Sequence, residues 1–321
     1  MSTLVDAKEK WTGTISTLVL GATREEGGSR TSKVTVGGSS TLPFMRFEGA
    51  VASRPAVAVE IWDTPPDDWP APLTEAWGDA MKSPAVWARK AVEECGAELI
   101  CLKLAGTHPD FGNKTPGEAA ATVKDVLKAV GVPLIIWGCD NDEKDNNVLP
   151  ACSQAAAGER CLMAAATEEN YKTLVASCQA DGHSLVGLSP IDINIAKQIN
   201  ILVSEMGFPL DRVVMYPTTG ALGYGLEYTY SIQERGRLAA LGGDKMMSLP
   251  VICMVGQEAW RAKETRASAE EQPTWGDAAT RGIYWELATA AALLQSGSDI
   301  MVMRHPKAAT ALKDTITRLI G

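Results

Sequence analysis

The sequence predicts an α/β fold, a closed (β/α)8 TIM barrel that follows an N-terminal β-hairpin extension. From residue 56 to the C-terminus, eight apolar runs alternate with eight helical stretches. Each run is short and rich in Val, Ile, Leu or Met rather than strictly alternating, which is typical of strands covered on both faces. We therefore expect residues 1–55 to form the extension and residues 56–321 the barrel.

The eight expected strands follow one another at the spacing of βα units. Proline behind a helix-capping residue begins helices at Ser83 and Thr115, the second within a capping box. Asp192 begins the helix after the fifth strand, and Gly297 ends the longest helix. The strands are expected at residues 56–63, 98–106, 132–140, 160–167, 183–190, 211–219, 249–256 and 298–305.

Residues 12–41 read differently from the barrel. Two β-rich pieces flank a charged, Gly-rich loop, ATREEGGSRT, which predicts a hairpin. Such a hairpin either closes the N-terminal end of the barrel or offers a strand edge to a partner. No stretch has the composition of a linker, so the chain is expected to be one domain with an N-terminal extension.

Composition excludes several classes of function. Asp and Glu number 39 against 30 Lys and Arg, and a net charge of −9 argues against binding nucleic acid or an anionic membrane. No apolar run approaches the roughly 20 residues that span a bilayer. The first ten residues carry four charges and no signal-like apolar region, so we expect a cytoplasmic protein.

Seven cysteines are scattered along the chain without a CxxC pair. Iron–sulfur and structural zinc sites usually need at least one closely spaced pair, so buried free thiols are the simpler interpretation. Cys139 differs from the others because it ends the third strand beside Asp140, at the expected barrel mouth.

Barrels of this type place their chemistry at the C-terminal ends of the strands. We expect Arg304 to pair with Asp63 or another mouth carboxylate, and His108 to bond a nearby carbonyl unless it serves a ligand. The residues expected to meet around the mouth are Asp63, Thr107, His108, Asp140, Asn141, Ser189, Thr218, Gln257, Arg304 and His305.

Two long loops, 64–83 and 257–275, break the plain βα pattern on this face. Both carry tryptophan, which is enriched at interfaces. There are two interpretations of the four tryptophans in these loops, Trp69, Trp77, Trp260 and Trp275. They either pack beneath their own loops or form an exposed docking surface for a partner protein. In the second case, we expect charged substitutions at Trp69 or Trp260 to weaken binding of that partner.

Two further loops have a distinctive composition. GCDNDEKDNN (138–147) is oxygen-rich without EF-hand spacing, so it is either a metal loop or a solvated capping loop. GALGYGLEY (220–228) lacks the GxGxxG order, and its glycines more simply let a planar ligand or a partner approach the backbone. GxSxG, HExxH and Walker sequences are absent.

Several stretches of the chain match one family. TLVLGATREEGGSRTSKVTVGGSSTLPFMRFEG, WGCDNDEKDNNVL, YPTTGALGYGLEYTYSIQERGRLAAL and IMVMRHP resemble the small subunit of the corrinoid iron–sulfur protein, the methyl carrier of the acetyl-CoA (Wood–Ljungdahl) pathway. The resemblance implies a heterodimer whose large subunit holds a [4Fe–4S] cluster and a corrinoid (cobalamin). The missing Cys spacing and the absent DxHxxG pattern agree with this division.

The resemblance implies methyl transfer from methyltetrahydrofolate, through a methyltransferase, to acetyl-CoA synthase/CO dehydrogenase. This chain would be a non-catalytic subunit that covers the partner's corrinoid and excludes water. No catalytic or metal-binding residue is expected in it. The candidate contacts to the corrinoid are Asp63, His108, Asp140, Asn141, Ser189, Thr218, Thr219, Gly220, Gly223 and His305.

Two other functions remain open from the residues. A barrel methyltransferase would hold a folate or pterin in its own mouth through Asp63, Asp140, Asn141 and Ser189. A purely structural scaffold would contact nothing there. Turnover of methyltetrahydrofolate with free cobalamin by the chain alone would favour the methyltransferase.

Overall fold

In the computed structural model, which describes residues 8–320, eight parallel strands form a nearly closed barrel in the order β8-β7-β6-β5-β4-β3-β10-β9. A single bridge between Met215 and Val251 closes it. Each strand lies within the run predicted for it: β3 Ala56–Trp62, β4 Leu99–Lys103, β5 Leu134–Trp137, β6 Leu162–Ala166, β7 Ser184–Leu188, β8 Val213–Tyr216, β9 Ile252–Cys253 and β10 Ile300–Met303. Residues 1–7, part of the stretch without a signal-like region, lie outside the described residues.

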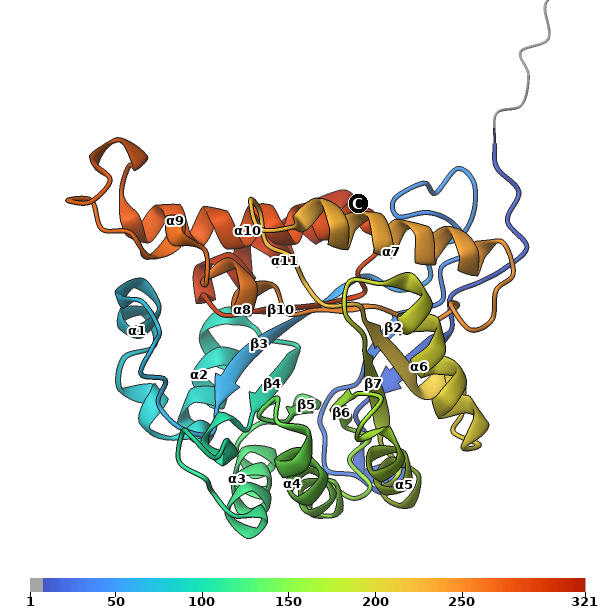
Figure 1. Ribbon diagram of the computed structural model, residues 1–321, viewed down its shortest axis with the longest axis horizontal. Coiled ribbons are helices and arrows are strands. Elements are labelled where there is room, and N and C mark those ends of the chain that lie inside the picture. The colour runs from blue at the N-terminus through green and yellow to red at the C-terminus, as the bar shows by residue number, and fades with distance from the viewer. Residues whose placement is uncertain (1–7, 321) are drawn as a thin grey trace, which may run out of the picture.

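The helices surround the strands, with α3 to α5 along the lower side of Figure 1 and α7 and α10 along the upper. Their ends confirm the predicted caps: Thr115 and Glu118 form a reciprocal capping box, Asp192 caps α6, and Gly297 ends α10 at φ +106°. The barrel helices are α2 Pro84–Cys95, α3 Pro116–Ala129, α4 Asp142–Ala155, α5 Tyr171–Asp181, α6 Ile193–Glu205, α7 Leu226–Leu241, α10 Ala278–Ser296 and α11 Pro306–Ile320.

Short helices fill the two long loops of the C-terminal face. The loop after β3 contains α1 (Ala71–Trp77) and the 3-10 helix η2 (Gly78–Lys82), and the region after β9 contains α8 (Val255–Ala259), α9 (Lys263–Arg266) and η5 (Pro273–Trp275). Three other 3-10 turns are η1 (Arg24–Glu26), η3 (Ala105–Thr107) and η4 (Leu210–Arg212). None of the helices within residues 8–320 is long and apolar enough to cross a membrane.

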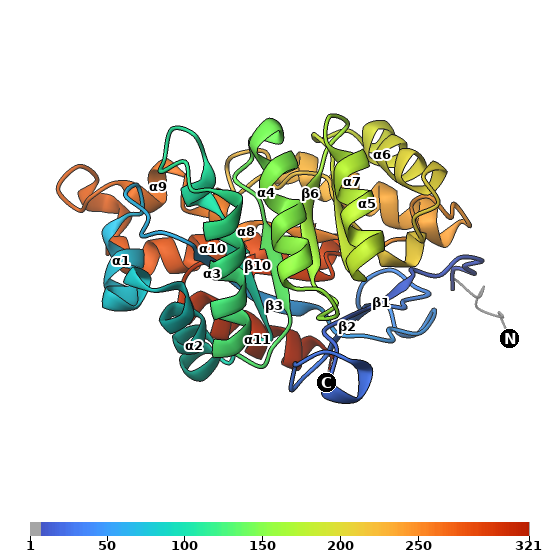
Figure 2. The ribbon, with the colours of Figure 1, turned by 90° about the horizontal axis from the view of Figure 1, so that it is seen from below.

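The N-terminal hairpin covers the opposite end of the barrel. Strands β1 (Thr17–Leu20) and β2 (Val34–Gly37) pair antiparallel and lie below α5 in Figure 2. Leu18, Leu20 and Val36 pack into the same apolar cluster as the inward-facing side chains of the barrel strands. The hairpin therefore adds to the floor of the barrel interior, which is the first of its two expected roles.

We expect Leu20→Ala to lower the free energy of unfolding by about 2–5 kcal/mol, because it opens a cavity beneath the barrel. The neighbouring Val19 is a matched control, since its side chain is 37% exposed and its truncation should cost less than about 1 kcal/mol. Urea unfolding of both variants measures the difference. Equal destabilisation of the two would show that the hairpin does not belong to the barrel core.

Candidate functional site

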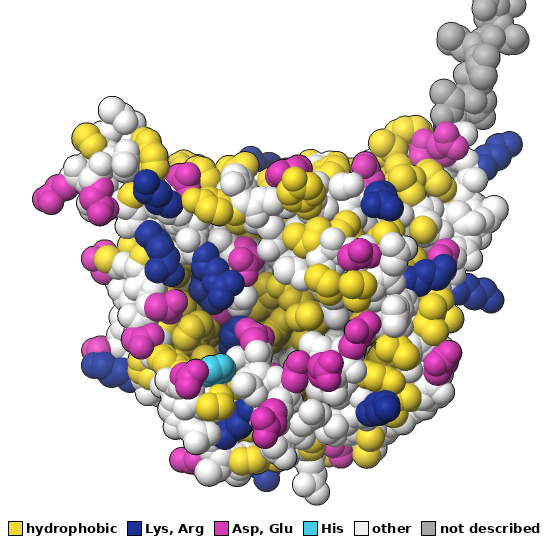
Figure 3. Space-filling view, viewed as in Figure 1, with side chains coloured by type: hydrophobic (Ala, Val, Ile, Leu, Met, Phe, Trp, Pro, Cys, Tyr) yellow, Lys and Arg dark blue, Asp and Glu magenta, His cyan; other side chains and the backbone are white. Residues whose placement is uncertain are grey.

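The C-terminal ends of the strands surround a cavity of about 330 Å³, which we call the mouth cavity. Figure 3 shows a hollow in the middle of one face, bordered by basic and acidic side chains. The charged residues of the cavity wall are Asp67, Asp68, Lys103, Asp140, Arg261 and Arg304. The others that bear on its chemistry are Trp62, His108, Phe111, Cys139 and Gln257.

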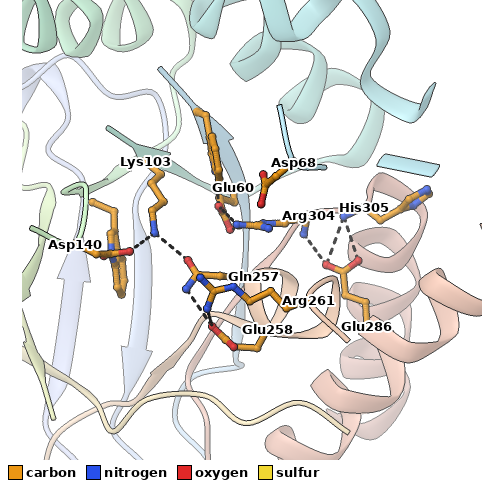
Figure 4. Close-up of polar contacts among 12 residues, drawn as sticks. Glu60, Asp68, Lys103, Asp140, Gln257, Glu258, Arg261, Glu286, Arg304 and His305 are labelled. Atoms are coloured by element: carbon orange, nitrogen blue, oxygen red, sulfur yellow. Dashed lines mark hydrogen bonds and ion pairs between the residues drawn. The ribbon is translucent and has the colours of Figure 1, made fainter. Parts of the chain in front are cut away.

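A buried ion pair joins the first and last barrel strands at the wall of this cavity (Figure 4). Arg304, at the end of β10, donates from Nε and Nη2 to the two carboxylate oxygens of Glu60 on β3, at 3.0 and 2.7 Å. Burial alone would raise the pKa of Glu60, but the Arg304 charge overcomes it and the pKa is lowered. The guanidinium also lies 4.8 Å from the ring centre of Trp69 and 5.5 Å from that of Trp62.

The backbone of Arg304 is held as firmly as its side chain. Its N–H donates to the buried carboxylate of Glu286 on α10, and its carbonyl accepts from Trp77 Nε1 at 2.8 Å. Glu286 also accepts from Trp260 Nε1 at 2.8 Å. Burial raises the pKa of Glu286 to about 7 despite these donors. Two loops and α10 thus fix where Arg304 sits.

A second ion pair crosses the mouth between β4 and β5. Lys103 Nζ lies 2.5 Å from Asp140 Oδ2 and 2.9 Å from Gln257 Oε1, and Trp137 Nε1 donates to Asp140 Oδ1 at 3.0 Å. Burial opposes ionisation of Asp140, yet the Lys103 charge lowers its pKa. Asp140 adopts φ +65°, an uncommon conformation for a residue with a side chain, which aims its carboxylate at Lys103.

Three further wall residues have different surroundings. Burial raises the pKa of the Cys139 thiol to about 11, so it stays protonated. His108 sits at the rim with a third of its side chain exposed, and its Nδ1 accepts from Asp110 N at 3.1 Å rather than bonding a carbonyl as the sequence suggested. Arg261 is turned toward Glu258, at 3.0 Å.

The structure brings His108 and Asp140 together at the mouth cavity and places the other predicted contacts elsewhere. The carboxylate of Asp63 is buried, where it accepts from Gly106 N at 2.7 Å and pairs with Lys114. Asn141 caps α4 by accepting from Lys144 N at 2.9 Å. Local backbone donors therefore hold these two side chains.

The candidates after β7 and β8 connect strand ends. Thr218 Oγ1 donates to the Ser189 carbonyl, Thr219 Oγ1 accepts from Met254 N, and Gly220 N donates to Thr229. Ser189 Oγ is buried and has no hydrogen-bond partner in the described part of the chain. Gly223, at φ +76°, lies outside against Trp285.

His305 faces away from the cavity. Its ring stacks on Trp260 with the ring centres 5.9 Å apart, and its Nδ1 accepts from Lys307 N at the start of α11. The expectation that its side chain lies at the mouth with Arg304 is wrong, because Trp260 and the first turn of α11 hold the imidazole outside the cavity.

The expectation of an exposed surface around Trp69 and Trp260 is also wrong. Trp69, Trp77 and Trp260 are buried beneath their own loops, whereas Trp275 is 36% exposed. Charged substitutions at Trp69 or Trp260 would disturb the support of Arg304 itself. The first of the two interpretations offered for these loops therefore holds for three of the four tryptophans.

Sequence reasoning missed Glu60 and Lys103, which carry the two ion pairs. Both interrupt runs that are otherwise apolar, AVAVEIWD and ELICLKLAG. A charge within a buried strand is costly unless it is paired, so these interruptions were the available signal.

Comparison with known protein families shows to which family the chain belongs. The family model described as "CO dehydrogenase/acetyl-CoA synthase delta subunit" matches residues 18–317. The chain belongs to this family. Acetyl-CoA decarbonylase/synthase subunit delta of Archaeoglobus fulgidus is 36% identical over 98% of the chain and 70% of that protein, and the Methanosarcina thermophila delta 1 subunit is 36% identical over 97% and 72%. The delta subunit is the small subunit of the corrinoid iron–sulfur protein, as the sequence resemblance indicated.

Solved structures confirm the fold of this delta-subunit family member. Dihydropteroate synthase from Xanthomonas albilineans, in complex with 7,8-dihydropteroate, aligns with a TM-score of 0.56 at 14% identity over 85% of this chain and 97% of that one. The Coxiella burnetii enzyme in complex with pteroic acid gives a TM-score of 0.56 at 13% identity, covering 87% and 98%. At these identities the likeness concerns the TIM barrel alone.

We expect the free energy of unfolding of this chain to depend on pH, because His305 is buried. Burial, assisted by the Lys307 charge, lowers its pKa from 6.5 to about 4. Between these values the unfolded chain binds a proton that the folded chain does not, so stability is lost as pH falls from above 6.5 toward 4. Asn is a good N-cap without this titration.

We expect the stability of His305→Asn, relative to wild type, to improve by about 1–2 kcal/mol between pH 7.5 and pH 5. Urea unfolding at the two pH values measures the change. A constant difference between variant and wild type would mean that His305 titrates normally in the folded chain.

Proposed function

We propose that this chain is the non-catalytic barrel subunit of a heterodimeric corrinoid iron–sulfur methyl carrier. Its mouth covers a corrinoid held mainly by the large subunit, while the methyl group passes from methyltetrahydrofolate, through a methyltransferase, to acetyl-CoA synthase/CO dehydrogenase. The observation that carries this proposal is that the two carboxylates held between the strand ends, Glu60 and Asp140, are paired with Arg304 and Lys103 of the same chain.

This pairing bears directly on catalysis. A general acid or base needs a titratable group whose pKa lies near the working pH and which reaches the reacting atom. Glu60 and Asp140 are held ionised by Arg304 and Lys103, and both have lowered pKa values. The mouth is therefore suited to positioning a ligand and excluding water rather than to moving protons.

The donors of the mouth fit the edge of a corrinoid. Acetamide side chains at that edge present carbonyl oxygens. The Arg261 guanidinium, which is exposed on the cavity wall and uses Nη1 for Glu258, offers N–H groups that suit them. Asp67 and Asp68 offer acceptors for the amide N–H groups. When bound, the corrinoid supplies the cobalt that takes up and passes on the methyl group.

The size of the cavity suits a mouth that covers one face of a corrinoid rather than one that encloses the whole molecule. About 330 Å³ is near the lower limit of small-molecule sites and smaller than a whole corrinoid, so the ring would lie across the mouth. Trp62 and Phe111, whose ring centres are 6.1 Å apart, give the cavity an apolar wall. An apolar wall keeps water from the reacting carbon.

The cysteines support a division of cofactors between subunits. A [4Fe–4S] cluster takes four converging thiolates, and the seven cysteines here are all free and buried in different elements of the barrel. We therefore assign the cluster to the large subunit.

The methyltransferase alternative receives less support. Of the four residues expected to hold a pterin, Asp140 lines the cavity but is bound by Lys103 and Trp137. Asp63, Asn141 and Ser189 are directed elsewhere or buried behind the wall. A pterin would have to displace these internal contacts.

Single alanine substitutions at the mouth test the proposal. Replacing His108 or Asp140, or the more distant Ser189, Thr218 or His305, should slow methyl transfer by about tenfold or less, a barrier change of about 1.4 kcal/mol. Loss of an essential general acid or base costs about a hundredfold or more. Single-turnover methylation of the assembled heterodimer measures each rate. A thousandfold loss in any variant whose corrinoid remains bound and reducible would make this barrel catalytic.

A further inference from the structure

The outer face of α10 carries an exposed cluster of aromatic side chains next to the rim of the barrel. We call Leu222, Trp275, Tyr284, Trp285 and Ala288 the α10 surface; they line a shallow, mainly apolar pocket of about 440 Å³. Tyr284 is 64% exposed, and Tyr228, in the first turn of the adjacent α7, is 63% exposed. Figure 1 shows α7 and α10 together along the upper edge of the molecule.

The fold holds this surface in place. Trp285 Nε1 donates to the Leu222 carbonyl at 3.1 Å, and Leu222 N donates to Thr289 Oγ1 at 3.2 Å. The Arg281 guanidinium lies 5.6 Å from the ring centre of Trp275 and donates to the carbonyls of two residues in the loop after β9. The rings of Trp275 and Trp285 are therefore held by contacts within the chain.

The charged groups within the pocket serve the fold. Arg281 makes the contacts just described, and Asp277 caps α10 by accepting from Thr280 N at 2.8 Å. The pocket thus offers rings and aliphatic carbon on a chain whose net charge is −9. Tyr and Trp enrichment together with depletion of charge marks the core of protein interfaces, and contiguous exposed apolar surface is uncommon without a partner.

Two chain segments lead from the mouth to the α10 surface. Leu222 lies in the loop that follows β8, and Trp275 ends the segment that begins beside Gln257 and Arg261 on the cavity wall. Tyr224 ties the two segments together, because its hydroxyl donates to Glu264 at 2.9 Å and accepts from Lys263 N. The same two segments therefore border the mouth and the α10 surface, so a protein that covers the mouth lies next to this surface.

We propose that the α10 surface is the docking site for the large, corrinoid-bearing subunit, which would meet it with an apolar, aromatic-rich face of its own. This inference rests on the proposed function, because it takes the mouth to be covered by that subunit. The mouth contacts, which are polar, would then set the position of the corrinoid, and the α10 surface would supply most of the binding energy.

The test places a charge in the surface and measures assembly. Tyr284→Glu and Ala288→Glu change exposed positions one turn apart on α10, so both chains should fold with unchanged thermal stability. Titration calorimetry with the purified large subunit should show binding at least about tenfold weaker for each variant. Phe47→Glu is the matched control, since its ring is 62% exposed in a turn outside this surface, and its affinity should stay within about threefold of wild type.

Two results would overturn the inference. One is that both α10 variants bind the large subunit as tightly as the control. The other is a self-associated wild-type chain, seen by sedimentation, that Tyr284→Glu converts to monomer while the affinity for the large subunit stays unchanged. The visible spectrum of the large subunit's corrinoid, recorded with and without the wild-type chain, tests the proposed function separately. Tight binding without any spectral change would contradict the proposal that this chain covers the corrinoid. It would not contradict the α10 surface as the docking site.

Discussion

The ion pair between Glu60 and Arg304 is the constraint on which the mouth depends. It joins the first barrel strand to the last, two elements far apart in sequence that pair side by side. Removing one partner of a buried ion pair typically costs about 3–5 kcal/mol, because the other charge is left uncompensated. Here Trp62 Nε1 also donates to Glu60 at 2.6 Å, so three N–H groups bind the two carboxylate oxygens. The pair fixes the shape of the site more than it stabilises the barrel.

The two long loops are organised around the same arginine. Trp69 lies against its guanidinium, Trp77 bonds its carbonyl, and Trp260 bonds the Glu286 carboxylate that receives its N–H. Contacts from four separate segments thus hold Arg304 in one position. The mouth therefore has one fixed arrangement of side chains, in which the buried charges of Glu60 and Asp140 are neutralised within the chain.

Much of the fold could be predicted from the sequence because its signals are local. Apolar runs predicted all eight strands, because helices bury one face of each strand and the barrel interior buries the other. The caps at Thr115, Asp192 and Gly297 predicted helix ends to the residue. The site was harder, because a position at the end of a strand does not determine where a side chain points. Asp63 and Asn141 stand at the expected strand ends, but nearby N–H groups bind their side chains. Burial of Trp69 and Trp260 depends on Arg304 and Glu286, which lie far away in sequence.

The most direct test of the central claim measures which end of this chain faces the corrinoid. All seven native cysteines are buried, so a nitroxide can be attached selectively to His108→Cys at the mouth or to Phe47→Cys in the turn before β3. In the heterodimer, with the corrinoid in its paramagnetic Co(II) state, electron paramagnetic resonance reports the proximity of label and cobalt. Our account predicts strong relaxation of the mouth label and little effect on the label at residue 47. Equal effects on both labels, or a stronger effect at residue 47, would contradict it.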